Sequence, residues 1–111
     1  MMAMKSQPSK FTVIYPPIIK QHLKFIAAKY YSLICEAIET QLQFDPDAEK
    51  RNRKPLKRPV GFGARWEIRF GPNNRFRVFY RIDYEHRQVI VLAIGEKRGN
   101  RLLVGEEEIE I

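Results

Sequence analysis

Two segments in which apolar and polar residues alternate, residues 65–70 and 75–82, most strongly restrict the fold of this chain. Such alternation is typical of a β-strand with one buried face. The inward positions are Trp66, Ile68, Phe70, Phe76, Val78, Tyr80 and Ile82. Because Gly71-Pro-Asn-Asn74 between the segments is a strong turn signal, we expect a β-hairpin.

The other face of this hairpin is predicted to carry five arginines, Arg65, Arg69, Arg75, Arg77 and Arg81. Unpaired charge is costly to bury, so we expect this face to be open and not covered by helices. A guanidinium group binds phosphate through two hydrogen bonds. The face is therefore a candidate phosphate-binding surface.

The other segments indicate further strands and two helices. Residues 11–15 are β-branched and aromatic, as in a strand, and two prolines follow them. Residues 18–44 lack Gly and Pro and repeat apolar residues at helical spacing. One helix of that length would span about 40 Å, so we expect a helical hairpin that breaks at residues 29–32. Residues 50–59 are typical of an extended basic surface loop, and residues 89–94 of a central strand.

The predicted fold class is α+β in two layers, with the N-terminal strand and helical hairpin packed on an antiparallel β-sheet. One domain is expected at residues 11–104, after a flexible lead-in at residues 1–10. Residues 105–111 form an acidic tail with two interpretations. It is either a solvated terminus, the default, or a short strand or lid whose carboxylates lie over the arginines.

The charge distribution favours a polyanionic partner. The net charge is +7, and residues 50–101 hold 15 basic against 4 acidic residues. Such a block attracts nucleic acid, although a basic surface also aids solubility.

No cluster of His, Cys and carboxylates has metal-ligand spacing, so no metal or cofactor is expected. The chain has no apolar run long enough to span a membrane. Its only cysteine, Cys35, fits a reducing cytoplasm and is expected to be a packing residue.

Several motifs resemble the RelE/ParE toxin superfamily over residues 11–104. They are the helical hairpin, Lys54-Pro-Leu-Lys57, Trp66-Glu-Ile-Arg-Phe70, Arg75-Phe-Arg-Val-Phe-Tyr80 and Ile94-Gly-Glu-Lys-Arg98. The resemblance implies a toxin of a type II toxin-antitoxin system that is neutralised by an antitoxin. RelE-like members cleave mRNA in the ribosome without a metal, through attack of the ribose 2′-hydroxyl on the adjacent phosphate.

By position, the resemblance implies that Arg77, Arg98 and Arg69 are the catalytic residues. We expect Arg77 to stabilise the phosphate and the transition state. Further contacts to RNA or ribosome are expected from Lys54, Lys57, Arg58, Arg65, Arg75, Arg81 and Lys97. Each of these residues could instead only solvate its own segment.

The chain also departs from the family pattern. Glu67 stands where RelE has a strand lysine, and residues 102–104 replace an expected C-terminal tyrosine. The general base is therefore unassigned. Glu67 is either that base or, the interpretation we favour, an ion-pair partner of Arg77 or Arg81. Two alternative functions remain: a ParE-like inhibitor of DNA gyrase, and a non-catalytic ribosome- or RNA-binding module.

Overall fold

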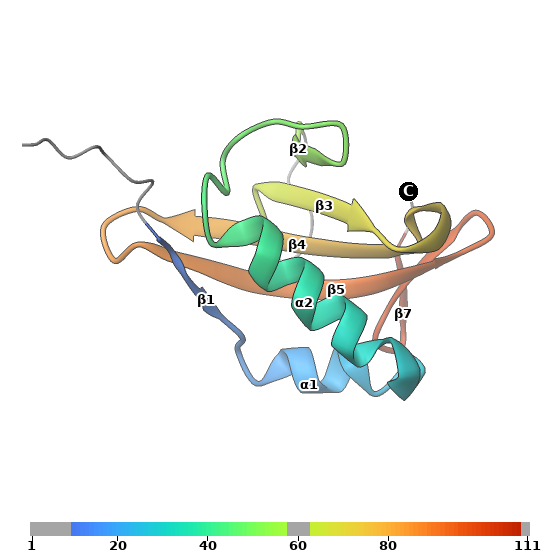
Figure 1. Ribbon diagram of the computed structural model, residues 1–111. Coiled ribbons are helices and arrows are strands. Elements are labelled where there is room, and N and C mark those ends of the chain that lie inside the picture. The colour runs from blue at the N-terminus through green and yellow to red at the C-terminus, as the bar shows by residue number, and fades with distance from the viewer. Residues whose placement is uncertain (1–9, 58–62, 110–111) are drawn as a thin grey trace, which may run out of the picture.

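The computed structural model describes residues 10–57 and 63–109. Its two α-helices are α1 (Ile18–Leu23) and α2 (Tyr31–Leu42), and its two short 3-10 turns are η1 (Ala28–Tyr30) and η2 (Pro72–Asn74). The strands are β1 (Thr12–Ile14), β2 (Arg53–Pro55), β3 (Trp66–Phe70), β4 (Phe76–Asp83), β5 (Gln88–Arg98), β6 (Arg101–Val104) and β7 (Glu107–Ile109). The predicted α+β architecture, with helices on one face of a sheet, is confirmed (Figure 1).

The strands form one sheet in the order β2-β3-β4-β5-β6-β7, and β1 pairs with β5. All pairings are antiparallel except that of β1, which runs parallel to β5. The predicted hairpin is β3–β4, with Trp66 opposite Tyr80 and Phe70 opposite Phe76. Its turn follows Gly71, whose φ of 83° lies in the region that glycine adopts without strain.

The helical hairpin breaks earlier than residues 29–32, the position expected from the sequence. Helix α1 ends at Leu23, and α2 begins at Tyr31. Ala27 between them is extended, with ψ of 134°. The Tyr31 hydroxyl donates a 2.7 Å hydrogen bond to the Leu23 carbonyl, which also accepts one from the Ile26 amide at 2.9 Å. An aromatic side chain from the second helix therefore stabilises the end of the first.

The main core lies between α2 and the sheet. From α2, Ile34, Ile38 and Leu42 are fully buried. They belong to the same cluster as the inward residues of the β3–β4 hairpin, among them Ile68 and Val78. This packing confirms the inward face that the alternation predicts.

Strand β5 and the segment after it differ from expectation. The predicted strand at residues 89–94 continues to Arg98, so Lys97 and Arg98 belong to a strand. Two further strands, β6 and β7, follow it. Residues 107–109 of the acidic tail thus form a short strand, which is the second of the two interpretations. Its Glu108 pairs with Arg101 at 2.8 Å and not with the hairpin arginines.

The outward face of the hairpin is less open than expected. It carries a second apolar cluster that includes Phe79, Ala93, Leu102 and Val104. Leu56 and Ala64, which lie between β2 and β3, and Ile109 of β7 also pack there. This extra cover buries Arg77, which is only 6% exposed. The expectation of a fully solvated arginine face was wrong, because the sheet also has a small core on this side.

The basic segment at residues 50–59 is also not purely a surface loop. Arg53 in β2 is 2% exposed. Its guanidinium group donates to the carbonyls of Gln41 and Asp45, at 2.5 and 2.7 Å. Arg53 therefore stabilises the end of α2 and the turn after it.

Candidate nucleic-acid interface

Three charged residues gather on the outward face, which we call the second face. Glu67 Oε1 accepts a hydrogen bond from Arg69 Nε at 3.2 Å, and Glu67 Oε2 lies 3.6 Å from Arg77 Nη1. The Arg69 side chain is 44% exposed, whereas that of Arg77 is 7% exposed. Burial lowers the pKa of Arg77, the nearby Arg69 lowers it further, and Glu67 opposes both effects.

Strand register shows which other cations share this face. Arg77 lies opposite both Arg69 and Gly95, and Lys54 lies opposite Glu67. Lys97 lies two residues beyond Gly95 on β5 and therefore points to the same side. Arg69, Arg77, Lys97 and Lys54 thus share the second face. The Nε atom of Arg77 is buried without a hydrogen-bond partner in the part of the chain that the structure describes.

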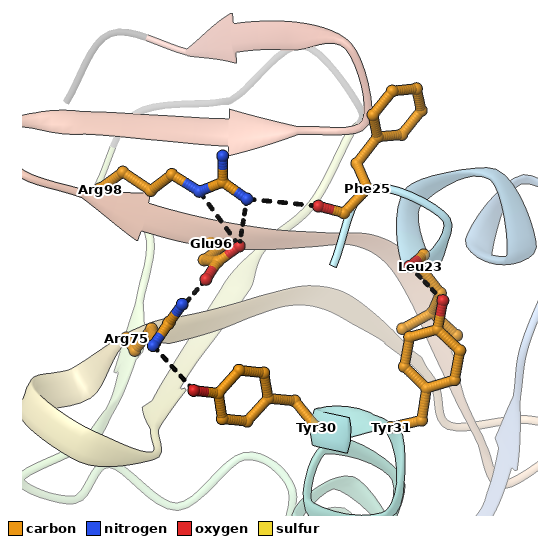
Figure 2. Close-up of polar contacts among 7 residues, drawn as sticks. All are labelled: Leu23, Phe25, Tyr30, Tyr31, Arg75, Glu96 and Arg98. Carbon is orange, nitrogen blue, oxygen red and sulfur yellow. Dashed lines mark hydrogen bonds and ion pairs between the residues drawn. The ribbon is translucent and has the colours of Figure 1, made fainter. Parts of the chain in front are cut away.

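Arg75 and Arg98 lie on the helix side of the sheet instead. Phe76 lies opposite Glu96, so Glu96 points toward the helices, as does Arg98 two residues later. Glu96 accepts hydrogen bonds from Arg75 Nε at 2.5 Å and from Arg98 Nη2 at 3.0 Å (Figure 2). The prediction of Arg75 on the second face was wrong. It precedes β4 with helical φ and ψ, so the alternation of the strand does not extend to it.

These contacts separate the three residues predicted as catalytic. Arg69 and Arg77 lie together, whereas Arg98 points to the opposite side of the sheet. The sequence could not show which side of the sheet Lys97 and Arg98 each face, because the strand was expected to end at residue 94. Because β5 continues to Arg98, strand alternation places Lys97, and not Arg98, on the same side of the sheet as Arg77.

The remaining predicted residues are dispersed. Lys57 and Arg65 line one small pocket of about 280 Å³ beside Leu56 and Ala64. Arg81 is exposed, and the Lys54 amine pairs with Glu49 at 3.3 Å. Arg58 lies outside the described residues.

Glu67 is held in the ion-pair arrangement that we favoured from the sequence, with Arg77 and also with Arg69. Residues 102–104 form β6, in which Leu102 and Val104 are buried. The site therefore offers cations for a phosphate and one carboxylate already bound by two arginines. Sequence reasoning missed Glu96 and Tyr30 as partners of the arginines. The signal for Glu96 was a carboxylate within an otherwise apolar and basic strand.

Cys35 is exposed on α2, so the expectation of a packing role was wrong. In residues 10–57 and 63–109, no three His, Cys, Asp or Glu side chains are placed to hold a metal ion together. Within the same residues, no helix is both long and apolar enough to cross a membrane.

No protein-family model matches the chain, and no curated protein matches it. A search of solved structures finds a chain from the crystal structure of the toxin-antitoxin complex RelBE2 of Mycobacterium tuberculosis. The TM-score is 0.65 at 24% identity, and the match covers 84% of this chain and 98% of that chain. The two chains therefore share a fold, as the resemblance to RelE-like proteins implies.

Proposed function

We propose that this chain is the toxin of a toxin-antitoxin system and that it inhibits translation by cleaving mRNA bound to the ribosome. The observation that carries this proposal is the placement of Arg69, Arg77 and Lys97 on one face of the sheet. Cations placed together in this way can hold a phosphate and stabilise charge that develops on it.

The shared fold supports the proposal. The similar chain comes from a toxin-antitoxin complex, so the proposed protein partner of this chain is an antitoxin. The net charge of +7 suits a ribosomal and mRNA partner, and the proposed site of action is the cytoplasm, where ribosomes are.

The proposed reaction is transfer of a phosphate within the RNA chain. The ribose 2′-hydroxyl loses its proton and attacks the adjacent phosphorus. The bond to the leaving 5′-oxygen breaks, that oxygen takes a proton, and a 2′,3′-cyclic phosphate remains. Arg77 and Arg69 would stabilise the extra negative charge on the phosphorane. Glu67 holds both guanidinium groups in position, at 3.6 and 3.2 Å.

The test is an in-vitro translation reaction in which mRNA ends are mapped by primer extension, with and without ribosomes. The wild-type chain should produce cuts only when ribosomes are present. Arg69→Ala removes a half-exposed cation. It should reduce the cutting rate by about 10- to 100-fold, the order expected for loss of one transition-state contact.

Arg51→Ala is the matched control, since Arg51 is exposed in the turn before β2. Arg77→Ala should cause the larger loss of cutting. Because Arg77 is buried, this variant needs a melting curve that shows it is folded. If the wild-type chain, at concentrations that saturate the ribosomes, leaves the mRNA uncut and translation normal, the proposal is contradicted. A supercoiling assay would then test gyrase inhibition.

One observation favours a second function, a ribosome binder without chemistry. Glu67 is bound by two arginines, and residues 102–104 place buried leucine and valine where a proton donor is expected. In the same reaction, this alternative predicts that translation is blocked while the mRNA stays intact.

A further inference from the structure

A second group of cations lies at the other side of the sheet, around the buried carboxylate of Glu96. This carboxylate is 3% exposed and bridges two arginines, Arg75 through Oε2 and Arg98 through Oε1. Arg75 also donates to the Tyr30 hydroxyl at 3.0 Å and lies 4.7 Å from the centre of that ring. Arg98 donates to the Phe25 carbonyl at 3.4 Å (Figure 2). We call Arg75, Glu96 and Arg98 the clamp.

The clamp leaves hydrogen-bond donors unused. Arg75 Nη2 and Arg98 Nη1 have no partner among the described residues, and neither has the Lys97 amine. All three residues contribute to the lining of one cleft of about 480 Å³ at the end of the sheet, together with Pro72, Asn73 and Gly99. The two arginines belong to its helix side, and Lys97 reaches it from the second face. With Glu96 counted, the group carries three positive charges and one negative charge, a net charge of +2.

We propose that Arg75, Lys97 and Arg98 form an anion-binding site that takes a phosphate group. Among common anions, phosphate fits because two planar guanidinium groups and one amine can each donate to a different oxygen. The proposed cleavage of mRNA uses Lys97 but neither of the two arginines, and the fold comparison does not require this site. It lies at the end of the sheet, and its two arginines point away from Arg77.

The clamp prepares the site before the ligand arrives. Arginine loses much side-chain freedom when it is ordered, and this loss normally opposes binding. Here Glu96 and the Tyr30 ring already hold the Arg75 guanidinium group, and Glu96 holds Arg98. The hydrogen bond to Glu96 also raises the pKa of Arg75, so this residue stays charged. Lys97 makes no such contact and supplies the adaptable third charge.

The phosphate group can come from two sources, a free phosphate compound or the backbone of a single-stranded polynucleotide. Pyrophosphate and a deoxythymidine oligonucleotide serve as the two probes. The oligonucleotide has no 2′-hydroxyl, so the proposed cleavage cannot occur and binding is measured alone. The measurement is a titration of the full chain followed by backbone amide NMR shifts.

We expect pyrophosphate to shift the amides of residues 73–75 and 97–99 before those of residues 67–69. Arg98→Gln should weaken binding at least about tenfold, the order expected for loss of one charged hydrogen-bond donor. Arg51→Gln, which removes the same charge from an exposed position, should weaken it less than about twofold. Lys97→Gln should also weaken binding, and it leaves the clamp contacts in place.

Each outcome decides the assignment. If Arg98→Gln weakens both probes, the site takes polynucleotide phosphate; if it weakens pyrophosphate alone, the site takes a free phosphate compound. Equal affinities for Arg98→Gln and Arg51→Gln would overturn the proposal. Tighter Arg98-dependent binding of a poly-glutamate peptide would also overturn it, in favour of an acidic protein segment. Absence of mRNA cleavage would leave these binding results unaffected.

Discussion

Charged side chains are part of the interior of this small domain. Arg53, Glu67, Arg77 and Glu96 are all buried within the described residues. Three of them form ion pairs, whereas Arg53 donates only to backbone carbonyls. A buried charge is tolerated when it is paired or hydrogen-bonded, so the partners of these residues must stay in place for the chain to fold.

Arg53→Met should lower the free energy of unfolding by about 2–4 kcal/mol, because it keeps most of the volume but leaves buried carbonyls without donors. The measurement is urea denaturation. Arg51→Met is the matched control, since Arg51 is exposed two positions away, and it should change stability by less than about 0.5 kcal/mol. Similar losses in both variants would show that Arg53 contributes only charge.

At the scale of single residues, the sequence predicts part of the candidate site. Alternation correctly places Arg69 and Arg77 on one face. It fails at Arg75, because Asn73 and Asn74 before it have positive φ and the chain there is not extended. Arg98 was chosen on the resemblance, and alternation could not distinguish its face from that of Lys97, because period-two alternation gives a face only where the strand's length is known.

Among the elements, β5 organises the fold. It is eleven residues long, and it pairs with β4 along one edge within residues 88–96. The other edge is shared by β1 at residues 88–90 and β6 at residues 95–98. Helix α1 packs against β5 between them, where the His22 ring accepts a hydrogen bond from the Ile94 amide at 3.2 Å. A helix side chain thus takes the place of a strand partner.

Gly95→Ala tests how tightly β5 and β6 pack. A Cβ atom at this position would lie 2.9 Å from Val104 Cγ2 and 3.0 Å from the Leu103 carbonyl oxygen. We expect a loss of about 1–3 kcal/mol in the free energy of unfolding, as for overpacked cores. In a double-mutant cycle with Val104→Ala, the combined loss should be smaller than the sum of the single losses. Additive losses would show that the two side chains do not meet.

The strands at the C-terminal end could not be predicted as readily as the β3–β4 hairpin. Strand β7 contains Glu107-Glu-Ile109, a composition that local propensity assigns to a solvated tail. It becomes a strand because one edge of β6 is available to pair with it and because Ile109 packs on the second face. Tertiary contacts, and not local preference, determine this element.

In the whole molecule, α1 links the N-terminal half to the C-terminal strands through His22. A Cβ atom on Gly105, in the turn before β7, would lie 3.3 Å from the His22 ring. Burial lowers the pKa of His22 below its ordinary value near 6.5, and Glu107 only partly opposes this effect. Protonation of the ring nitrogen that accepts from Ile94 would remove this contact.

The melting temperature should therefore fall as the pH is lowered from 7.5 to 5.5. As the pH falls below 6.5, the unfolded chain takes up a proton at His22 before the folded chain does. The free energy of unfolding therefore decreases as the pH falls. His22→Gln should flatten this dependence, because glutamine accepts a hydrogen bond but does not titrate. His86→Gln is the control, since His86 is exposed, and it should keep the dependence. An unchanged slope in His22→Gln would contradict the assignment.

The parallel pairing of β1 with β5 also affects when the chain can finish folding during synthesis. Thr12 leaves the ribosome early, but its partner Gln88 is made only after the helices and three further strands. Pairing between such distant segments is slow, since a long loop must close first. Until then β1 has no neighbour in the sheet, and α1 lacks the strand that it packs against. The sheet therefore stays incomplete until β5 has left the ribosome.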